Sequence, residues 1–268
     1  MQKFEKDYAK LVAKILTQGV TKETRNGKTI SIFGESLVIN DLHNYFPLLQ
    51  GRKMYPNGIF GELAAMLRKP KHIEDFEKFG CNYWKKWAKP DGSISVDYGN
   101  AWFDFEGYDQ IAALKESLAN NPNDRRMIIN SWRPHKLKDL DLPCCHYSYQ
   151  FYVANGYIDM IWTQRSVDTM VGLPSDIAYA AAWLIAIANE FNLIPGKIKL
   201  DLGDCHIYEE HIEGAELYLN RVSTNSVGTA PGYLYGPKTG TDFCTFKPED
   251  IFLSEYESLP PIKFELKE

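Results

Sequence analysis

Residues 142–153 read LPCCHYSYQFYV, and residues 157–163 read YIDMIWT after the turn signal Ala-Asn-Gly. Both runs are rich in aromatic and β-branched residues and are joined by a short turn with glycine, so they predict an antiparallel hairpin. The first strand of that hairpin opens with Cys144, Cys145 and His146. The hairpin therefore places two thiols and an imidazole at the start of a buried strand.

The segments on either side of the hairpin mix helical and extended patterns. Apolar residues at helical spacing predict helices over residues 8–16, 59–67, 111–118 and 208–221. The Ala-rich stretch 176–191 is apolar nearly all round and predicts a buried helix. β-Branched and aromatic residues predict further strands at 29–40 (interrupted at Gly34), 127–132, 197–208 and 261–266.

This order of elements is neither a strict β-α-β alternation nor all-β. It predicts an α+β fold in which helices pack on a mostly continuous sheet. The chain of 268 residues has no internal repeat and no Pro/Gly/Ser-rich linker, and 44% of its residues are hydrophobic. Because this composition is sufficient for one well-packed core, we expect a single domain over residues 1–268.

The bulk composition argues against several classes of function. The formal net charge is −5, so no broad basic surface for duplex nucleic acid is expected. The first ten residues, MQKFEKDYAK, are charged, unlike a signal peptide, and no apolar run reaches the roughly 18 residues of a membrane span. We therefore expect a cytoplasmic protein without membrane contact. The cysteines number five and are irregularly spaced, which argues against a disulfide framework, and the absence of a CxxC pair argues against a zinc site, so we expect no metal.

Cys145 is the first candidate for chemistry. A nucleophilic cysteine needs a depressed pKa, which a nearby cation or hydrogen-bond donor supplies. The predicted hairpin brings Arg165 of the next strand close to Cys145, and His146 is its neighbour in sequence. Taken alone, this pattern is better explained by packing, because a cysteine at a strand start commonly serves as a small buried hydrophobe.

Arginines in loop-like contexts form a second pattern. Arg25, Arg125 and Arg126 lie in polar turns, and Arg165 is followed by Ser166. Guanidinium groups beside a hydroxyl are the usual cradle for a phosphate, because they are permanently charged, bidentate donors. For any one of these arginines, a solvated or salt-bridged role is the better interpretation.

Two further patterns follow the hairpin. His206 and Tyr208 are two residues apart on a predicted strand, so they project to one face and can hydrogen-bond a sugar hydroxyl. The alternative is a satisfied histidine beside a partly buried aromatic ring. Asp176 begins the Ala-rich helix, where an N-cap, which stabilises by roughly 1 kcal/mol, is the simplest explanation.

Taken in order, nine stretches of the chain resemble the thymidylate synthase family, and the resemblance covers nearly the whole sequence. They are RNGKTISIFGESL, FPLLQGRKM, GIFGEL, DYGNAW, NPNDRRMIINSW, LPCCHYSYQFYV, QRSVDTMVGLPSDIAY, GDCHIYEEHIEGAELYLNR and PPIKFEL. The resemblance implies a homodimer formed through a large twisted mixed sheet. It also implies a pyrimidine nucleotide monophosphate as substrate and 5,10-methylenetetrahydrofolate as the one-carbon donor.

The resemblance implies a role for individual residues by position. Cys145 matches the nucleophile that attacks C6 of the pyrimidine, and Cys144 stands where the family usually has proline, so it is a bystander. The other catalytic positions are Glu62, which moves protons and organises water, Tyr98, Arg165 and Asp176. The nucleotide contacts are Arg25, Gln164, Ser166, His206 and Tyr208, with Arg125 and Arg126 reaching the same phosphate from the other subunit. The folate contacts are Trp84, Asp168 and Gly172, and the C-terminal PPIKFELKE matches a tail that closes over the folate.

Asp176 departs from the family pattern, because thymidylate synthases carry asparagine there. An asparagine amide donates to uracil O4 and accepts from uracil N3–H, whereas an ionised aspartate only accepts. In a buried site that mismatch costs roughly 1–3 kcal/mol. The 4-amino group of cytosine satisfies a carboxylate, and a proton shared between N3 and the carboxyl stabilises the C6 adduct more than the ground state. Bacteriophage deoxycytidylate hydroxymethylases are family members with aspartate at this position.

We therefore expect one-carbon transfer to dCMP. Capture of the methylene by water, giving 5-hydroxymethyl-dCMP, ranks first, dCMP methylation second and dUMP methylation third. Ser175, where synthases usually have a large aromatic residue, favours water, whereas the indoles of Trp84 and Trp87 favour hydride transfer. The alternative from another class is a catalytically silent nucleotide-binding protein, against which the retention of Cys145 and Glu62 argues. A phage protein of this kind acts in the host cytoplasm.

Overall fold

The computed structural model of the protein describes residues 2–224, 230–236 and 238–267. The strands are β1 (Val20–Thr24), β2 (Gly27–Ile39), β3 (Ile128–Asn130), β4 (His146–Ala154), β5 (Tyr157–Asp168), β6 (Ile194–Tyr208), β7 (Gly232–Tyr235) and β8 (Ile251–Ser254). The α-helices are α1 (Lys3–Gln18), α2 (Pro56–Met66), α3 (Glu74–Glu77), α4 (Tyr98–Phe103), α5 (Gln110–Asn120), α6 (Gly172–Glu190) and α7 (Ile212–Thr224). Short 3-10 helices are η1 (Tyr83–Trp87), η2 (Pro134–Asp139), η3 (Glu209–His211), η4 (Phe243–Thr245) and η5 (Pro248–Asp250).

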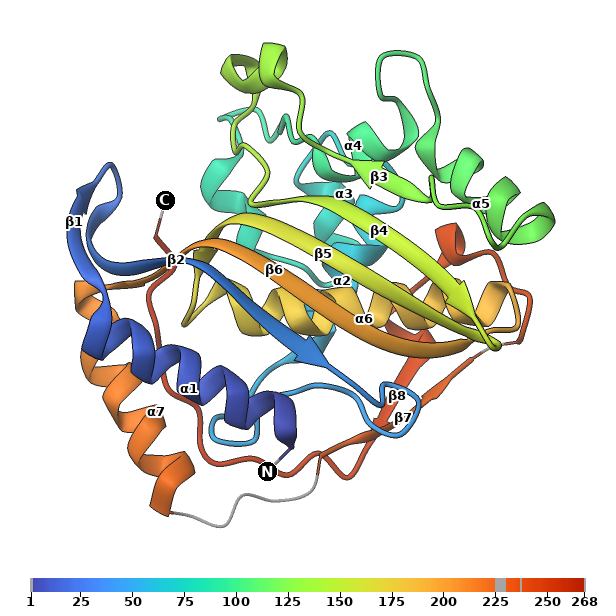
Figure 1. The fold of residues 1–268 in the computed structure, drawn as a ribbon. Helices are drawn as coiled ribbons and strands as arrows, with labels where there is room; N and C mark the ends of the chain where they lie inside the picture. The colour runs from blue at the N-terminus through green and yellow to red at the C-terminus, as the bar shows by residue number, and fades with distance from the viewer. Residues whose placement is uncertain (1, 225–229, 237, 268) are drawn as a thin grey trace.

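In the described part of the chain, six strands form the main sheet, in the order β1-β2-β6-β5-β4-β3. Neighbouring strands are antiparallel except β5 and β6, which run parallel. The sheet is twisted, and α6 crosses behind it (Figure 1). A second, two-stranded sheet pairs β7 with β8. Helices flanking a large mixed sheet confirm the predicted α+β class.

The predicted hairpin is confirmed as β4 and β5. Val153 pairs with Ile158 across the turn, and His146 pairs with Gln164 at the far end. The two turn residues, Asn155 and Gly156, have φ values of 52° and 79°. Positive φ at both central residues is what a tight turn matched to strand twist requires, so Asn-Gly is well suited to this turn.

Helix α6 is the predicted buried helix, but it begins one turn earlier than expected. Its side chains from 177 to 188 are all buried, with Trp183 stacked on Trp102 at 4.3 Å between ring centroids. The first residue is Gly172, so the interpretation of Asp176 as an N-cap is wrong. Asp176 instead lies in the second turn, where its carboxyl is free for other contacts.

Asp168, at the end of β5, orders the turn that leads into α6. Its Oδ1 atom accepts hydrogen bonds from the backbone N–H groups of Met170 and Val171, both at 3.0 Å. Because those N–H groups lie just before the helix, they would otherwise lack a partner. Asp168 therefore fixes the turn before the helix, whose N-cap residue, Val171, has no side-chain capping bond.

The predicted strand at residues 261–266 is wrong. This segment has no ladder partner, and it is held by side chains instead. Phe264 packs so closely on α7 that a Cβ added to Gly214 would lie 2.4 Å from its ring. The backbone oxygen of Glu265 contacts Nε2 of His211 at 2.9 Å. The C-terminal tail is therefore anchored to the η3–α7 region by side-chain contacts.

The remaining predicted elements are confirmed with shifted ends. The strand expected at 127–132 shortens to β3, and the helix expected from 208 begins at Ile212, because Tyr208 still belongs to β6. Strand β2 continues through Gly34, where φ is 85° and the register skips from Phe33 to Glu35. Glycine tolerates that backbone conformation without strain, so it marks an irregularity and does not end the strand.

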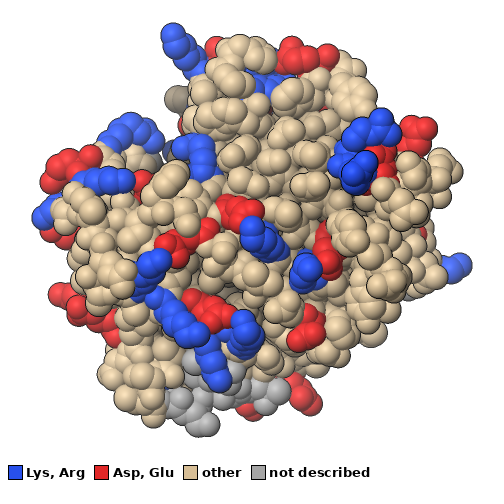
Figure 2. Space-filling view, in the orientation of Figure 1, with Lys and Arg blue, Asp and Glu red and all other residues tan. Residues whose placement is uncertain are grey.

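The sheet face that α6 does not cover is turned toward the viewer in Figures 1 and 2. Charges of both signs are scattered over this view, with uncharged surface between them (Figure 2). Phe33, Tyr152 and Ile161 are exposed large hydrophobic residues on strands of the sheet.

Among the described residues, no helix is long and apolar enough to cross a bilayer.

Candidate active site

Cys145 lies just before β4 and is held from two sides. Its backbone N–H donates to the Tyr98 hydroxyl at 2.8 Å, and its carbonyl accepts from the Arg165 N–H, also at 2.8 Å. The neighbour Cys144 is buried, whereas Cys145 is partly exposed. The hairpin therefore places Arg165 beside Cys145 as predicted, and Cys145 is the more accessible of the two adjacent cysteines.

Arg165 is positioned by backbone oxygens of the same loop. Its Nε donates to the Cys144 carbonyl at 2.8 Å and its Nη2 to the Pro143 carbonyl at 3.3 Å, while the guanidinium lies over the Trp132 ring. A Cβ at Gly203 of β6 would lie 2.6 Å from the Arg165 backbone oxygen. Glycine at this position therefore lets β6 pack closely against the strand that carries the arginine.

A nucleophilic cysteine needs a depressed pKa, but the surroundings of Cys145 raise it. Burial raises the pKa of the Cys145 thiol to about 11, the charge of Asp176 raises it further, and Arg165 opposes both. The adjacent His146 supplies no cation, because burial lowers its pKa to about 3. Its ring instead packs on Trp162 at 4.2 Å and Tyr98 at 4.5 Å between centroids. At neutral pH, Cys145 is therefore a thiol beside a neutral imidazole.

Asp176 points from α6 toward β5. Its Oδ2 accepts a hydrogen bond from Nε2 of Gln164 at 2.7 Å. Gln164 is itself fixed, because its Nε2 also donates to the Ser166 carbonyl at 3.2 Å and its Oε1 accepts from Trp162 Nε1 at 3.3 Å. Burial raises the pKa of Asp176 to about 8, and the charge of Glu62 contributes. The carboxyl is therefore mostly protonated at neutral pH and offers one donor and one acceptor.

Glu62 of α2 is a second carboxyl, and no cation among the described residues pairs with it. The Tyr83 hydroxyl donates to its Oε2 at 2.6 Å, and Trp84 Nε1 donates to its Oε1 at 2.7 Å. Burial raises the pKa of Glu62 to about 7, which suits a group that gives and takes protons near neutral pH. Trp84 is buried and stacks on Phe76, and this packing holds its indole N–H beside the Glu62 carboxylate.

Tyr83 is a candidate that the sequence does not reveal. It lies in the aromatic stretch 83–87, next to Trp84, and its side chain remains partly exposed while its hydroxyl contacts Glu62. The only signal in the sequence is that aromatic run. Glu62 and Tyr83 are 21 positions apart in the sequence, with an entire short helix between them, so spacing alone cannot bring the two together.

The predicted sugar contacts lie together at the end of β6. The rings of His206 and Tyr208 meet edge to face at 5.2 Å between centroids, and both side chains are largely buried. Nδ1 of His206 lies 3.3 Å from an Asp204 carboxylate oxygen. Parallel pairing places His206 opposite Asp168 of β5, so these residues share one end of the sheet with Ser166.

Gly172 stands at the start of α6, between Asp168 and Asp176. A Cβ added there would meet Asp176 Oδ2 at 3.6 Å and Asp168 Cβ at 3.7 Å, which are ordinary contacts. No described residue of the protein therefore requires glycine at this position. Its small size leaves room for a ligand to approach the helix start.

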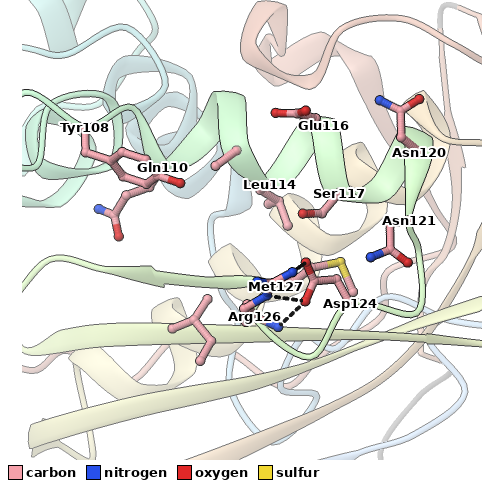
Figure 3. A pocket seen from close by; sticks show the side chains of 12 residues that line it. Tyr108, Gln110, Leu114, Glu116, Ser117, Asn120, Asn121, Asp124, Arg126 and Met127 are labelled. Atoms are coloured by element: carbon pink, nitrogen blue, oxygen red, sulfur yellow. Dashed lines mark hydrogen bonds and ion pairs between the residues drawn. The ribbon is translucent and has the colours of Figure 1, made fainter.

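The four predicted phosphate arginines are not brought together within one chain. Arg25 lies at the exposed turn between β1 and β2, and Arg165 lies on central β5. Arg125 and Arg126 precede β3 at the opposite edge of the sheet. Arg126 makes a two-point ion pair with Asp124 and lines a pocket of about 450 Å³ beside α5 (Figure 3). Within one chain, Arg125 and Arg126 therefore lie at a different edge of the sheet from Arg25.

A family model described as thymidylate synthase matches residues 6–268. That match spans the hairpin, both candidate carboxyls and the C-terminal tail described above. The chain belongs to the thymidylate synthase family. As a member, it is a folate-dependent enzyme that transfers a one-carbon unit to C5 of a pyrimidine nucleotide, with methylenetetrahydrofolate as the donor. In the described parts of this thymidylate synthase family member, no group of three or more His, Cys, Asp or Glu side chains could hold a metal ion.

Proposed function

We propose that this family member transfers the one-carbon unit to dCMP and that water captures it, giving 5-hydroxymethyl-dCMP. The observation that carries the proposal is Asp176, protonated at neutral pH and oriented by Gln164. A neutral carboxyl can donate its proton to N3 of cytosine and accept a hydrogen bond from the 4-amino group. An asparagine cannot give up a proton in this way.

The first step uses Cys145 and Asp176 together. The Cys145 thiol loses its proton to solvent, and the sulfur forms a bond to C6 of the ring, which pushes an electron pair toward N3. Asp176 donates its proton to N3, so the adduct is neutral at the base and the aspartate becomes the anion. Because N3 becomes more basic only as the C–S bond forms, this proton stabilises the transition state more than the ground state.

Glu62 and Tyr83 are the groups we assign to the later proton transfers. After C5 bonds to the one-carbon unit, the C5 proton must leave, and Glu62 with a pKa of about 7 can accept it. Cleavage of the bond between the transferred carbon and the folate nitrogen, which takes up a proton, then releases tetrahydrofolate and leaves an exocyclic methylene at C5. Water adds to that methylene and loses a proton, sulfur leaves C6, and N3 returns its proton to Asp176. The Tyr83 hydroxyl, 2.6 Å from Glu62 and partly exposed, provides a polar contact for that water.

Polarity around the carboxyls favours water capture over hydride transfer. Ser175 precedes Asp176 and is partly exposed, with its hydroxyl bonded to the Val171 carbonyl at 3.3 Å. The second candidate, methylation of dCMP, is favoured by the paired indoles of Trp84 and Trp87, whose rings lie 5.5 Å apart. These indoles can shield the methylene from water, which favours hydride transfer and a methylated product.

We also propose a homodimer formed through the uncovered face of the main sheet. Phe33 is 80% exposed and Tyr152 is 62% exposed on that sheet, and such hydrophobic side chains gain stability when a partner covers them. A two-fold contact would carry Arg125 and Arg126 of one copy toward the other copy's Arg165. Sedimentation at micromolar concentration tests this, with Phe33→Asp expected to shift the protein toward monomer.

The test of the reaction is product analysis with dCMP and dUMP side by side. Incubation of 5-tritiated dCMP with methylenetetrahydrofolate should release tritium, and mass analysis should show a hydroxymethyl group. The absorbance of dihydrofolate should not rise, because tetrahydrofolate is the expected product. Tritium release from dUMP alone would overturn the substrate assignment, and a strong dihydrofolate signal with dCMP would establish methylation. Unchanged turnover in Cys145→Ser would overturn covalent catalysis.

A further inference from the structure

A basic groove of about 580 Å³ lies outside the candidate active site. Its walls come from the segment after α2, from α4 with the residues before it, and from η2. The charged lining residues are Arg68, Lys69, Lys71, Asp97, Asp104, Arg133 and Lys136. Five cations against two carboxylates make this groove strongly positive, although the whole chain has a formal net charge of −5.

A buried ion pair forms the floor of the groove. Arg133 and Asp97 have side chains only 8% and 2% exposed, and they meet through two hydrogen bonds, one of them from Nε to Oδ2 at 2.9 Å. A third hydrogen bond runs from Nη1 of Arg133 to the Asp104 carbonyl at 3.1 Å. A guanidinium has five N–H groups, so two of them make no hydrogen bond to a described residue. Arg133 therefore retains donor capacity at the groove.

The carboxylate of Glu106 already binds as an anion beside the groove. Its Oε1 lies 3.2 Å from Lys136 Nζ, 3.1 Å from His135 Nε2 and 3.7 Å from Nη1 of Arg133. These contacts lower the pKa of Glu106, with Lys136 the largest cause. The residue also has a φ of 55°, an unfavourable backbone conformation for a side chain of this kind. A strained and exposed carboxylate is a replaceable partner for these cations.

Of the other lining cations, Arg68 already donates to backbone oxygens of Ala64, Thr245 and Phe246, whereas the two remaining lysines pair with no described carboxylate. Within the described residues, Lys71 makes no ion pair, and Lys69 lies over the Phe103 ring at 5.4 Å without a carboxylate partner. The apolar side chains of the lining, Ile94 and Val96, are buried, so there is no exposed aromatic platform for a base. The chemistry of the groove thus suits several linked anionic groups and not a flat apolar ring.

We propose that the basic groove binds a compact polyphosphate, with Glu106 as an internal anion that the ligand displaces. Permanently charged Arg133 at the floor and lysines on two walls match phosphate groups spaced along a short chain. Adjacent cations raise local anion concentration, and the binding weakens as salt screens them. The groove residues are distinct from the cysteine, carboxyl and sugar positions of the candidate active site, so the inference does not depend on the reaction catalysed.

Calorimetric titration of the full-length protein with inorganic tripolyphosphate tests the proposal. The wild type should bind at low salt, and the charge reversals Lys71→Glu and Lys136→Glu should each weaken binding by about tenfold. Lys138→Glu, on the same 3-10 helix but outside the groove, is the matched control and should bind like the wild type. Glu106→Gln should tighten binding several-fold, because it removes the competing anion.

Two outcomes would overturn the groove assignment. One is absence of binding by the wild type at low salt. The other is a loss of binding in Arg165→Ala with no change in Lys71→Glu and Lys136→Glu, which would assign tripolyphosphate to the nucleotide site. Circular dichroism of each variant establishes that the fold is retained. The gain expected for Glu106→Gln cannot arise from misfolding, so it tests the site independently of the losses.

Discussion

Asp97 and Asp176 are two carboxyl groups that have different kinds of hydrogen-bond partner. Asp97 is buried against a guanidinium, whereas Asp176 is held by the neutral amide of Gln164. A cation stabilises the ionised form of a buried carboxyl, but an amide does so only weakly. The result is an ion pair beneath the basic groove and a proton-bearing acid near Cys145. The partner of a buried carboxyl therefore decides whether it holds structure or moves protons.

The largest effect should come from removing the cation at Asp97. Arg133→Met leaves a carboxylate buried without a partner, which should lower the free energy of unfolding by roughly 3–5 kcal/mol. Urea unfolding of the variant measures the loss. The double variant Arg133→Met with Asp97→Asn should recover much of it, whereas Arg126→Met, at an exposed pair, should behave like the wild type. Equal stability of Arg133→Met and the wild type would remove the contrast between the two carboxyls.

The next effect concerns the proton of Asp176. Asp176→Asn keeps the shape of the side chain but removes its acid, so kcat/KM for dCMP should fall by about 10²-fold. The amide now donates to O4 of uracil, so dUMP turnover should rise relative to dCMP. Steady-state kinetics with both nucleotides measure the switch. A variant that keeps its preference for dCMP would refute this account of base recognition.

The pH profile sharpens the same contrast. The folded pKa of Asp176 is raised to about 8, so its proton is present below that pH and is lost above it. The ratio of kcat/KM for dCMP between the wild type and Asp176→Asn should therefore fall as pH rises from about 7 to 9. The charge of ionised Asp176 also opposes thiolate formation at Cys145 in the wild type and is missing in Asp176→Asn, so this second effect lowers the ratio in the same direction. A ratio independent of pH would show that this proton has no part in the reaction.

The smallest effect should follow from Tyr83→Phe. The lost hydroxyl leaves Glu62 with the Trp84 N–H as its remaining side-chain donor and should raise the pKa of Glu62, because the Tyr83 hydrogen bond lowers it. We expect turnover of dCMP to fall about fivefold, corresponding to roughly 1 kcal/mol. The fraction of methylated product should rise as water loses a polar contact. The acid limb of the pH profile and the product ratio are the measurements, with Tyr108→Phe as an exposed control.

Local sequence signals predicted a large share of the architecture. The hairpin, and with it the approach of Arg165 to Cys145, followed from two strand-forming runs and an Asn-Gly turn. The buried helix α6 followed from its alanine content, and β6 from its β-branched residues. Predictions were wrong where the decisive contact is distant in sequence or absent from the ladder. Asp176 is not a cap, because the helix begins four residues before it at Gly172, and the tail is not a strand, because α7 holds it.

The sequence by itself determined which residues alternate between core and surface, where the chain turns, and that cysteine, arginine and aspartate of the family pattern are present. Only the tertiary structure determined the pKa values, and so the protonation states, of these side chains. Burial and partner choice raise the pKa of Cys145, Glu62 and Asp176, and both depend on groups brought from distant elements. Contacts such as Tyr83 with Glu62, or Glu106 with Arg133, likewise arise from packing. Side-chain identity is local information, whereas the electrostatic environment is a sum over the folded molecule.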